Sequence, residues 1–143
     1  MSLTPQAIIE TWAYSTLSAS SSLTALVGNR IYANEVPEAV DSPYPCVVFG
    51  FLAGDDLMIH SASRVWTETL YKVEVIGQDM PFSTVDFIYA IVDEILHRGS
   101  GTVAGGDVYS CVRQQIIQID ETGEGGLRYR RSGGLYSITA QPS

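Results

Sequence analysis

Residues 66–76 read Trp-Thr-Glu-Thr-Leu-Tyr-Lys-Val-Glu-Val-Ile, a regular alternation of apolar and polar residues. In a strand, neighbouring side chains point to opposite faces, so Tyr71, Val73 and Val75 share one face. The charged residues of the same stretch fall on the other face. The pattern predicts a strand with one side in the core and the other side in solvent or covered by something else.

A second strand is predicted just upstream, over Cys46–Leu52, where the run Cys-Val-Val-Phe-Gly-Phe-Leu is typical of a strand covered on both faces. Gly54-Asp55-Asp56 is expected to interrupt this strand. The polar residues His60–Ser63 then form the tip of a long hairpin whose returning strand is the alternating stretch.

Two helices are predicted outside this hairpin. Thr4-Pro5 supplies a capping hydroxyl and a favoured first-turn residue for a helix that runs to about Leu17. Residues 85–96 carry an apolar stripe at helical spacing, and Ser83 or Thr84 is the expected cap. A short helical turn over Leu23–Val27 and a brief strand at residues 30–32 lie between these elements.

The chain closes on two more alternating runs, Val108–Ile119 and Leu127–Ala140, joined by the turn-rich residues 121–126. Hairpin-linked strands with segregated helices indicate the α+β class. We therefore predict one domain over residues 1–143, an antiparallel sheet of about four strands from two hairpins, packed by two helices on one face. Trp66, Leu70 and Ile76 would lie on the open face, and such an apolar patch usually has a partner.

Composition excludes several classes of protein. The chain has 143 residues, 45% of them hydrophobic and only 17% charged, with a net charge of −8. Disorder is excluded by the apolar content, and a general nucleic-acid binder by the acidic surplus. The longest apolar run, residues 46–53, is too short for the roughly 20 residues of a membrane-spanning helix, and no secretory signal is expected. Cys46 and Cys111 fall in buried strands and are expected to be reduced, with a single buried pair as the less favoured alternative.

A catalytic or metal site is not predicted. His60 lies in a polar loop and His97 at a helix end, where a cation complements the backbone dipoles. Neither Asp55-Asp56 nor Asp93-Glu94 is preorganised as a carboxylate pair, and the glycines of residues 99–106 follow a helix rather than opening one. The competing interpretation is a small soluble enzyme or ligand-binding module with a site near Asp55, Asp56 and His60.

Three of the eight cations fall at Arg128, Arg130 and Arg131. On a strand, Arg128 and Arg130 share one face, and Arg131 lies on the other. Pairing across the hairpin is the first interpretation, contact with a neighbouring subunit the second, and contact with a phosphate backbone the third. The expected intrachain partners are the acids of the same hairpin, Asp120, Glu121 and Glu124.

Several segments form a characteristic series. They are the early helix, Leu26-Val-Gly-Asn-Arg-Ile-Tyr32, Val36-Pro37, Ser42-Pro-Tyr-Pro45 leading into Val47-Val-Phe-Gly50, the Asp55-Asp56 loop, and Tyr71-Lys-Val-Glu-Val75. Together they resemble the tail-completion, or tail-terminator, family of tailed bacteriophages. The similarity continues through the helix at residues 85–96 into the closing hairpin. It covers nearly the whole chain and is one of pattern, without a signature of reactive residues.

The resemblance implies a small α+β virion protein without enzymatic activity or cofactor. Such a protein assembles as a ring, typically a hexamer, at the head-proximal end of the tail. There it stops tail-tube polymerisation and joins tail to head.

The implied partners are other copies of the chain, the tail tube protein and a head-completion or neck protein, with DNA passing through the lumen without specific binding. The resemblance also implies that no membrane partner is involved and that the protein lies in the virion tail or neck after assembly in the host cytoplasm. The candidate subunit contacts are Met58, Arg64, Trp66, Arg128, Arg130 and Arg131.

Overall fold

A computed structural model describes residues 4–37, 43–58 and 64–142, with side chains at all of these positions except 56–58, 64–65 and 124. The helices are α1 (Pro5–Ser18), α2 (Ser21–Val27) and α3 (Phe82–Leu96). The strands are β1 (Ile31–Ala33), β2 (Cys46–Met58), β3 (Arg64–Gln78), β4 (Gly101–Val103), β5 (Gly106–Thr122) and β6 (Arg128–Pro142), with a 3-10 turn at Glu124–Gly126.

The predicted α+β class is confirmed, but the expected sheet of about four strands was too small. The described residues form one sheet of six strands in the order β1-β2-β3-β6-β5-β4. The two hairpins supply the four central strands as predicted, and β4 adds an antiparallel edge within the glycine-rich segment that was expected to be a loop. On the other edge β1 pairs parallel to β2, so the sheet is mixed rather than purely antiparallel.

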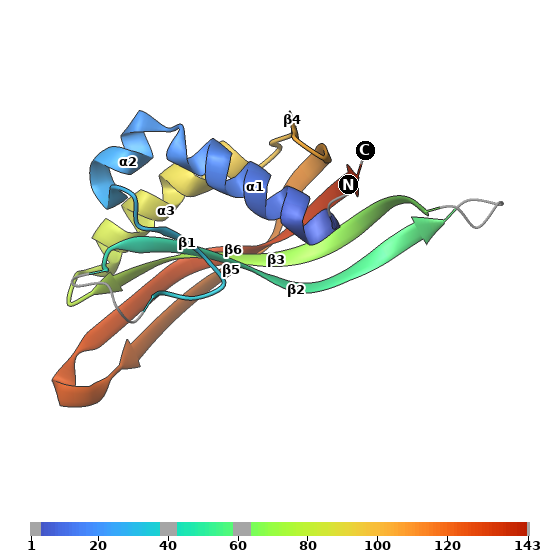
Figure 1. Cartoon of the computed structure of the whole chain (residues 1–143). Helices are drawn as coiled ribbons and strands as arrows, with labels where there is room; N and C mark the ends of the chain where they lie inside the picture. The colour runs from blue at the N-terminus through green and yellow to red at the C-terminus, as the bar shows by residue number, and fades with distance from the viewer. Residues whose placement is uncertain (1–3, 38–42, 59–63, 143) are drawn as a thin grey trace.

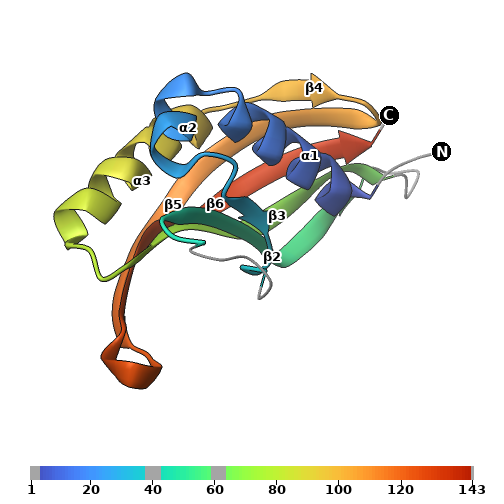
Figure 2. The same cartoon turned by 60° about the vertical axis from the view of Figure 1, so that its left-hand side comes forward.

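Three helices, rather than two, lie together over one face of this sheet (Figures 1 and 2). Thr4 accepts a hydrogen bond from the Ala7 N–H at the start of α1, and Ser20 caps α2 in the same way. Gly28 ends α2 with a φ of 61°, a value that suits a residue without a Cβ. The expected cap of α3 was wrong, because that helix begins after Pro81 without a side-chain cap.

The core lies between the helices and the helix-facing side of the sheet. Tyr71, Val73 and Val75 are all buried there, as the alternation predicts. The two central strands β3 and β6 approach closely, because Gly133 stands where any Cβ would meet the backbone of Val73 and Glu74. The helices contribute the other half of the core through Ile8, Ile9, Trp12, Leu17, Val85, Ile88 and Val92.

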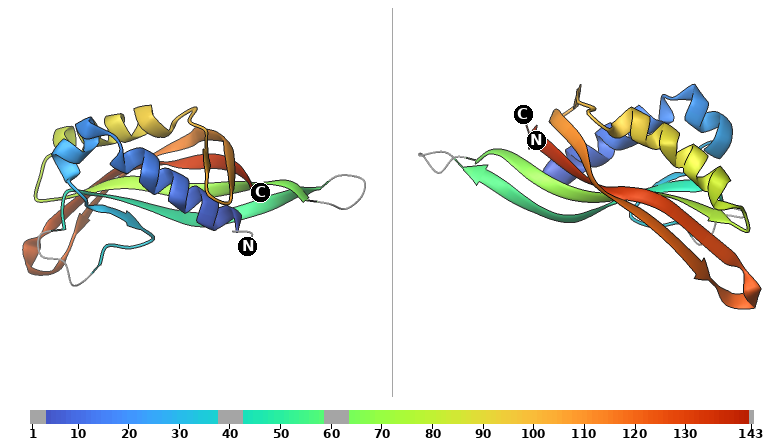
Figure 3. Two further views of the ribbon diagram at one scale, coloured as in Figure 1. Left: turned by 45° about the horizontal axis from the view of Figure 1, so that its top comes forward. Right: turned by 180° about the vertical axis from the view of Figure 1, so that it is seen from behind.

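The sheet is strongly curled, in the manner of a half-barrel. The pairing slips at Leu52 in β2, at Val65 in β3, and at Tyr109 and Gln114 in β5, and such bulges increase twist. The β2–β3 and β5–β6 hairpins extend beyond the helices at opposite ends of the sheet (Figures 1 and 3). The expected break at residues 54–56 was wrong, because these residues stay in β2 and pair with Thr67–Thr69 of β3.

The face away from the helices is called the open face below. On β3 it carries the even-numbered residues from Trp66 to Ile76, because pairing with β6 continues there without a slip. The predicted hairpin tip, residues 60–63, lies outside the described residues.

No helix in the described part of the chain is long and apolar enough to cross a membrane.

A methyl group at Gly133 tests the close approach of the central strands. We expect Gly133→Ala to lower the free energy of unfolding by about 3 kcal/mol, the upper part of the usual range for overpacking, because β3 and β6 must separate. Chemical denaturation measures this change. Ser137→Ala, a half-buried position on the same strand, is the control; equal stability of the two variants would contradict the argument.

Candidate functional site

One corner of the open face carries a second, small core. Cys46, Val48 and Ile76 are buried there, on the opposite side of the sheet from the main core. The chain itself covers them with partly buried aromatic and aliphatic residues, Tyr32, Val36, Tyr44 and Tyr129. Ile76, expected in an exposed patch, is therefore covered, whereas Leu70 is half-buried and Trp66 exposed.

A buried carboxylate lies beside this small core. Glu74 is only 2% exposed, and its Oε1 accepts a hydrogen bond from Arg131 Nη1 at 2.8 Å. Lys72 Nζ lies 3.6 Å from the same oxygen. The other carboxylate oxygen, Oε2, is buried and has no hydrogen-bond partner within the described residues. An ionised buried carboxylate depends on such pairing, because burial without it is costly.

Glu74 borders a cleft of about 500 Å³ on the open face. The cleft opens where β1 ends and the edge of β2 becomes free, beside Gly50, Phe51 and Leu52. The segment after β1 forms its wall with Asn34 and Glu35. The cleft therefore joins a polar floor to an apolar rim at one edge of the sheet.

The arginine cluster divides across the sheet as predicted. Arg128 Nε lies 3.3 Å from Asp120, and Arg130 Nε lies 3.9 Å from the same carboxylate. On the other face Arg131 bridges Glu121 and Glu74. Pairing across the hairpin is confirmed for Asp120 and Glu121, whereas the Glu124 side chain lies outside the described ones. Contact of these arginines with a neighbouring subunit stays a prediction.

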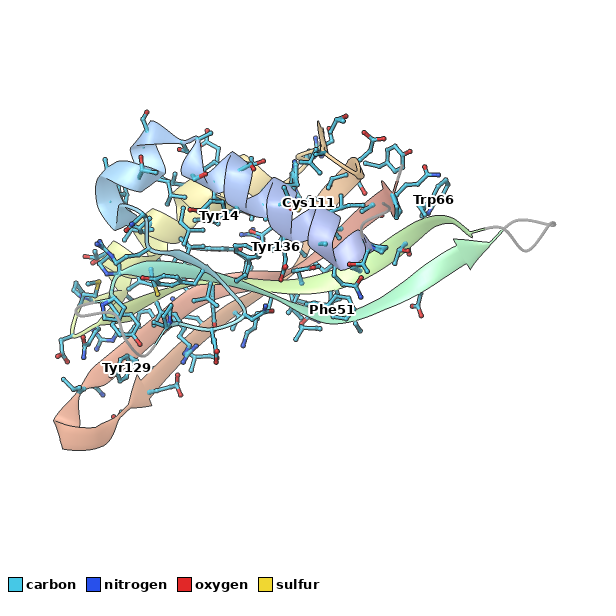
Figure 4. All side chains as sticks on the ribbon, in the orientation of Figure 1. Tyr14, Phe51, Trp66, Cys111, Tyr129 and Tyr136 are labelled. Carbon is cyan, nitrogen blue, oxygen red and sulfur yellow. The ribbon has the colours of Figure 1, made fainter. Side chains whose placement is uncertain are left out.

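The far end of the open face carries an exposed aromatic pair. Trp66 is 37% exposed (Figure 4). Its ring lies edge-to-face with that of Tyr109, a bulged residue of β5. Glu68 borders the same shallow groove. Of the other predicted contacts on this arm, Met58 and Arg64 pair with each other across β2 and β3, and their side chains lie outside the described ones.

The residues of the alternative enzyme site are only partly placed. Asp55 is exposed on β2 and pairs with Glu68, a residue of the same charge, across the hairpin. The side chain of Asp56 and all of His60 lie outside the described residues. His97 has a structural role, because its Nδ1 accepts a hydrogen bond from the backbone N–H of Arg113. No group of three histidines, cysteines or acids in the described part of the chain could hold a metal ion.

The two cysteines are free, so the alternative of a buried disulfide was wrong. Cys46 belongs to the small core on the open face and Cys111 to the main core, so they lie on opposite sides of the sheet. Burial raises the pKa of each thiol to about 12. Because the thiolate is the nucleophile, neither residue is suited to covalent catalysis.

A hydrogen-bonded cluster beneath α3 shows how the remaining buried polar groups are used. The hydroxyls of Tyr89 and Tyr136 are hydrogen-bonded to each other at 2.7 Å. The Tyr136 hydroxyl donates its proton to Asp93 Oδ1 at 2.6 Å. Arg113 pairs with the second oxygen of Asp93. Burial, followed by the hydrogen bond to Asp93, raises the pKa of Tyr136. The cluster joins α3 to the sheet.

Comparison with known proteins identifies the fold. No protein-family model matches the sequence, and no curated protein matches it either. Among solved structures, one matching chain superposes with a TM-score of 0.70 at 18% sequence identity, covering 98% of this chain and 100% of its own length. That chain comes from the virion of a native gene transfer agent particle. At this level of identity the likeness shows a shared fold.

Sequence reasoning missed the buried carboxylate and the cleft beside it. Glu74 stands among the charged residues of an alternating strand, a position that is usually solvated. The small core beside it is covered by Tyr44 and Tyr129, which come from segments distant in the sequence. The opposite charge of Arg131 was a visible signal, but only the β3–β6 register, in which Glu74 pairs with Gly133 and Ile76 with Arg131, brings the two residues together.

Removing the Arg131 guanidinium tests whether the structure depends on pairing Glu74. We expect Arg131→Met to lower the free energy of unfolding by about 3 kcal/mol, because it leaves a buried carboxylate with one weaker cation nearby. Thermal or urea unfolding measures this loss. Arg128→Met is the control, since its partner Asp120 is exposed and the expected loss is below about 1 kcal/mol. Equal losses of stability in the two variants would contradict the claim that the buried pair of Glu74 and Arg131 stabilises the fold more than an exposed pair does.

Proposed function

We propose that this chain is a structural subunit of a phage or phage-like virion, and specifically a tail-terminator protein. In this proposal it forms a ring, a hexamer in the simplest case, at the head-proximal end of the tail. The ring stops polymerisation of the tail tube and joins the tail to the head through a neck or head-completion protein. It has no enzymatic role.

The observation that carries the proposal is the full-length likeness to a virion chain, at a TM-score of 0.70 over 98% of the chain. The sequence pattern points independently to the tail-completion family, because the resembling segments extend from residue 26 into the closing hairpin. The two arguments use different information. The structural match compares backbone folds and, at 18% sequence identity, owes little to shared residues, whereas the family resemblance compares the sequence itself.

The open edges of the sheet favour assembly. In the described residues, β1 covers only residues 47–49 of β2, so residues 50–58 present a free edge. At the opposite edge of the sheet, β4 and the residues around Arg98 contact the outer edge of β5 only as far as Arg113. The outer edge of β5 is therefore unpaired within the described structure over residues 114–122. Long uncovered edges are unusual in monomers, because their backbone groups readily pair with another chain.

The directions of the edge strands suit a ring. Three successive antiparallel pairings separate β2 from β5, so these two strands run in opposite directions. The β5 edge of one copy can therefore meet the β2 edge of the next copy antiparallel, in a head-to-tail contact. The register aligns Gln115 with Gly50, and from this level the two free edges extend toward opposite ends of the sheet. They face each other only in a ring whose axis is inclined to the strands, so that neighbouring copies are displaced along them.

The acidic balance suits a ring around DNA. With a net charge of −8, the chain has little tendency to hold phosphates, and most of its described cations already pair with acids. In our proposal DNA passes through the lumen without specific binding, and repulsion by like charge keeps it from sticking.

Native mass spectrometry of the full chain at several concentrations tests the proposal. We expect a ring, either in isolation or on purified tail tubes, because the open edges pair only between copies. Electron microscopy of the same samples identifies where on the tube the protein lies. A chain that stays monomeric at every concentration and leaves the tubes bare would contradict the proposal.

The aromatic pair on the β2–β3 arm supplies a point mutation. We expect Trp66→Ala to raise the concentration needed for half-assembly at least tenfold, because an exposed aromatic residue is a typical interface anchor. Tyr14→Ala is the matched control, since Tyr14 is 48% exposed on α1, away from the open face (Figure 4). Circular dichroism checks that both monomers stay folded. Equal effects of the two substitutions would remove Trp66 from the interface.

A further inference from the structure

The open face carries a groove in which acids and aromatic rings lie together. Two adjoining depressions, of about 390 and 360 Å³, share the side chain of Glu68. Asp55 lines the first, and Trp66 and Tyr109 line the second. Trp66 and Glu68 stand on the same face of β3, about 7 Å apart along the strand. These four residues define the acidic-aromatic groove.

The two acids of the groove repel each other. Asp55 and Glu68 are directly opposite in the β2–β3 register, so their side chains share one face, with Cβ atoms about 5 Å apart. Like charges in this position destabilise a pair of strands. Among the described side chains, neither carboxylate has a hydrogen bond or an ion pair. A cation held between the two acids would remove the repulsion.

The chain's own arginines show which cation suits such a place. The Arg113 guanidinium lies 6.0 Å from the centroid of the Tyr89 ring and pairs with Asp93 at 3.3 Å. Arg130 lies over the Phe82 ring at 5.2 Å. A planar guanidinium can stack on a ring and donate to carboxylates at the same time, which a lysine ammonium does less well. The acidic-aromatic groove offers rings and carboxylates without a described guanidinium.

We propose that the acidic-aromatic groove binds an arginine side chain of another virion protein. Its guanidinium lies between Asp55 and Glu68 and against the Trp66 ring. That the partner belongs to a virion rests on the proposed function, whereas the groove itself can be tested on the isolated chain. If the partner is part of the tail tube, the contact makes Trp66 part of the interface for assembly on tubes.

A ring neighbour does not supply this arginine. In a copy placed without displacement, the register would bring Arg98, which is bonded to Cys111, level with Gly54. Pairing of the free edges displaces the neighbour along the strands and so carries its Arg98 away from Asp55. The other described arginine side chains are already bonded within their own chain: Arg30, Arg113, Arg128, Arg130 and Arg131.

Nuclear magnetic resonance of the full chain tests the site, with N-acetylarginine amide as the probe. Trp66 is 37% exposed and Trp12 only 3%, so the Trp12 indole signal is an internal control; Trp66→Phe identifies the other signal. We expect a saturable shift of the Trp66 signal alone. The neutral N-acetylcitrulline amide should give no saturable shift, and N-acetyllysine amide should bind at least threefold more weakly.

Substitutions that remove one charge test the two acids. We expect Glu68→Gln and Asp55→Asn each to weaken binding of the arginine probe at least fivefold, because each removes one carboxylate from the guanidinium. Glu94→Gln is the matched control, since it removes the same charge from an exposed position of α3, on the other side of the sheet. The amide spectrum of each variant checks that the chain stays folded.

The outcomes separate this site from the proposed function. Weaker binding in the two groove variants, with Glu94→Gln unchanged, would support the site. Equal binding of the arginine and citrulline probes, or equal losses in all three variants, would overturn it and leave the proposed ring standing. A Trp66 signal that shifts when the chain assembles alone, in a form that no longer binds the probe, would overturn the assignment to another protein. Specific binding by a chain that never assembles would support the site and contradict the proposed function.

Discussion

The close packing of β3 against β6 beneath the helices is the constraint on which the rest of the molecule depends. Gly133 lets the two strands approach, and Gly134 leaves room for the Tyr89 hydroxyl, which a Cβ there would meet at 2.6 Å. Tyr89 can then reach Tyr136 and join α3 to the sheet. The helices cover this one face, and bulges in the long strands curl the sheet around it.

Because all three helices lie on one side, the other face and both edges of the sheet are left for other contacts. The chain covers one corner with its own residues, where Tyr44 and Tyr129 pack edge-to-face over the small core. The rest of the open face carries half-buried aliphatic residues, the exposed Trp66 and a cleft with an incomplete carboxylate. Such an arrangement suits a subunit whose surface is completed by neighbours, and it accounts for a charge content as low as 17%.

Local sequence patterns predicted the helices and the four long strands, because capping residues and the periods of apolar residues act over a few positions. Thr4 stands at the start of α1 as expected. The brief strand expected at residues 30–32 is present as β1, but β4 was missed, since three residues carry no period and pair only where the sheet presents an edge. The partners of Glu74 could not be predicted, because they depend on register between strands distant in sequence.

The central claim is that the sheet edges are completed only between copies. Amide hydrogen exchange, measured on the monomer and on the assembled form and resolved to short peptides, tests it most directly. Edge residues 50–58 of β2 and 114–122 of β5 should exchange readily in the monomer and become protected on assembly, whereas the central strand β6 should be protected in both. Equal exchange of the two edges in both forms would contradict this account.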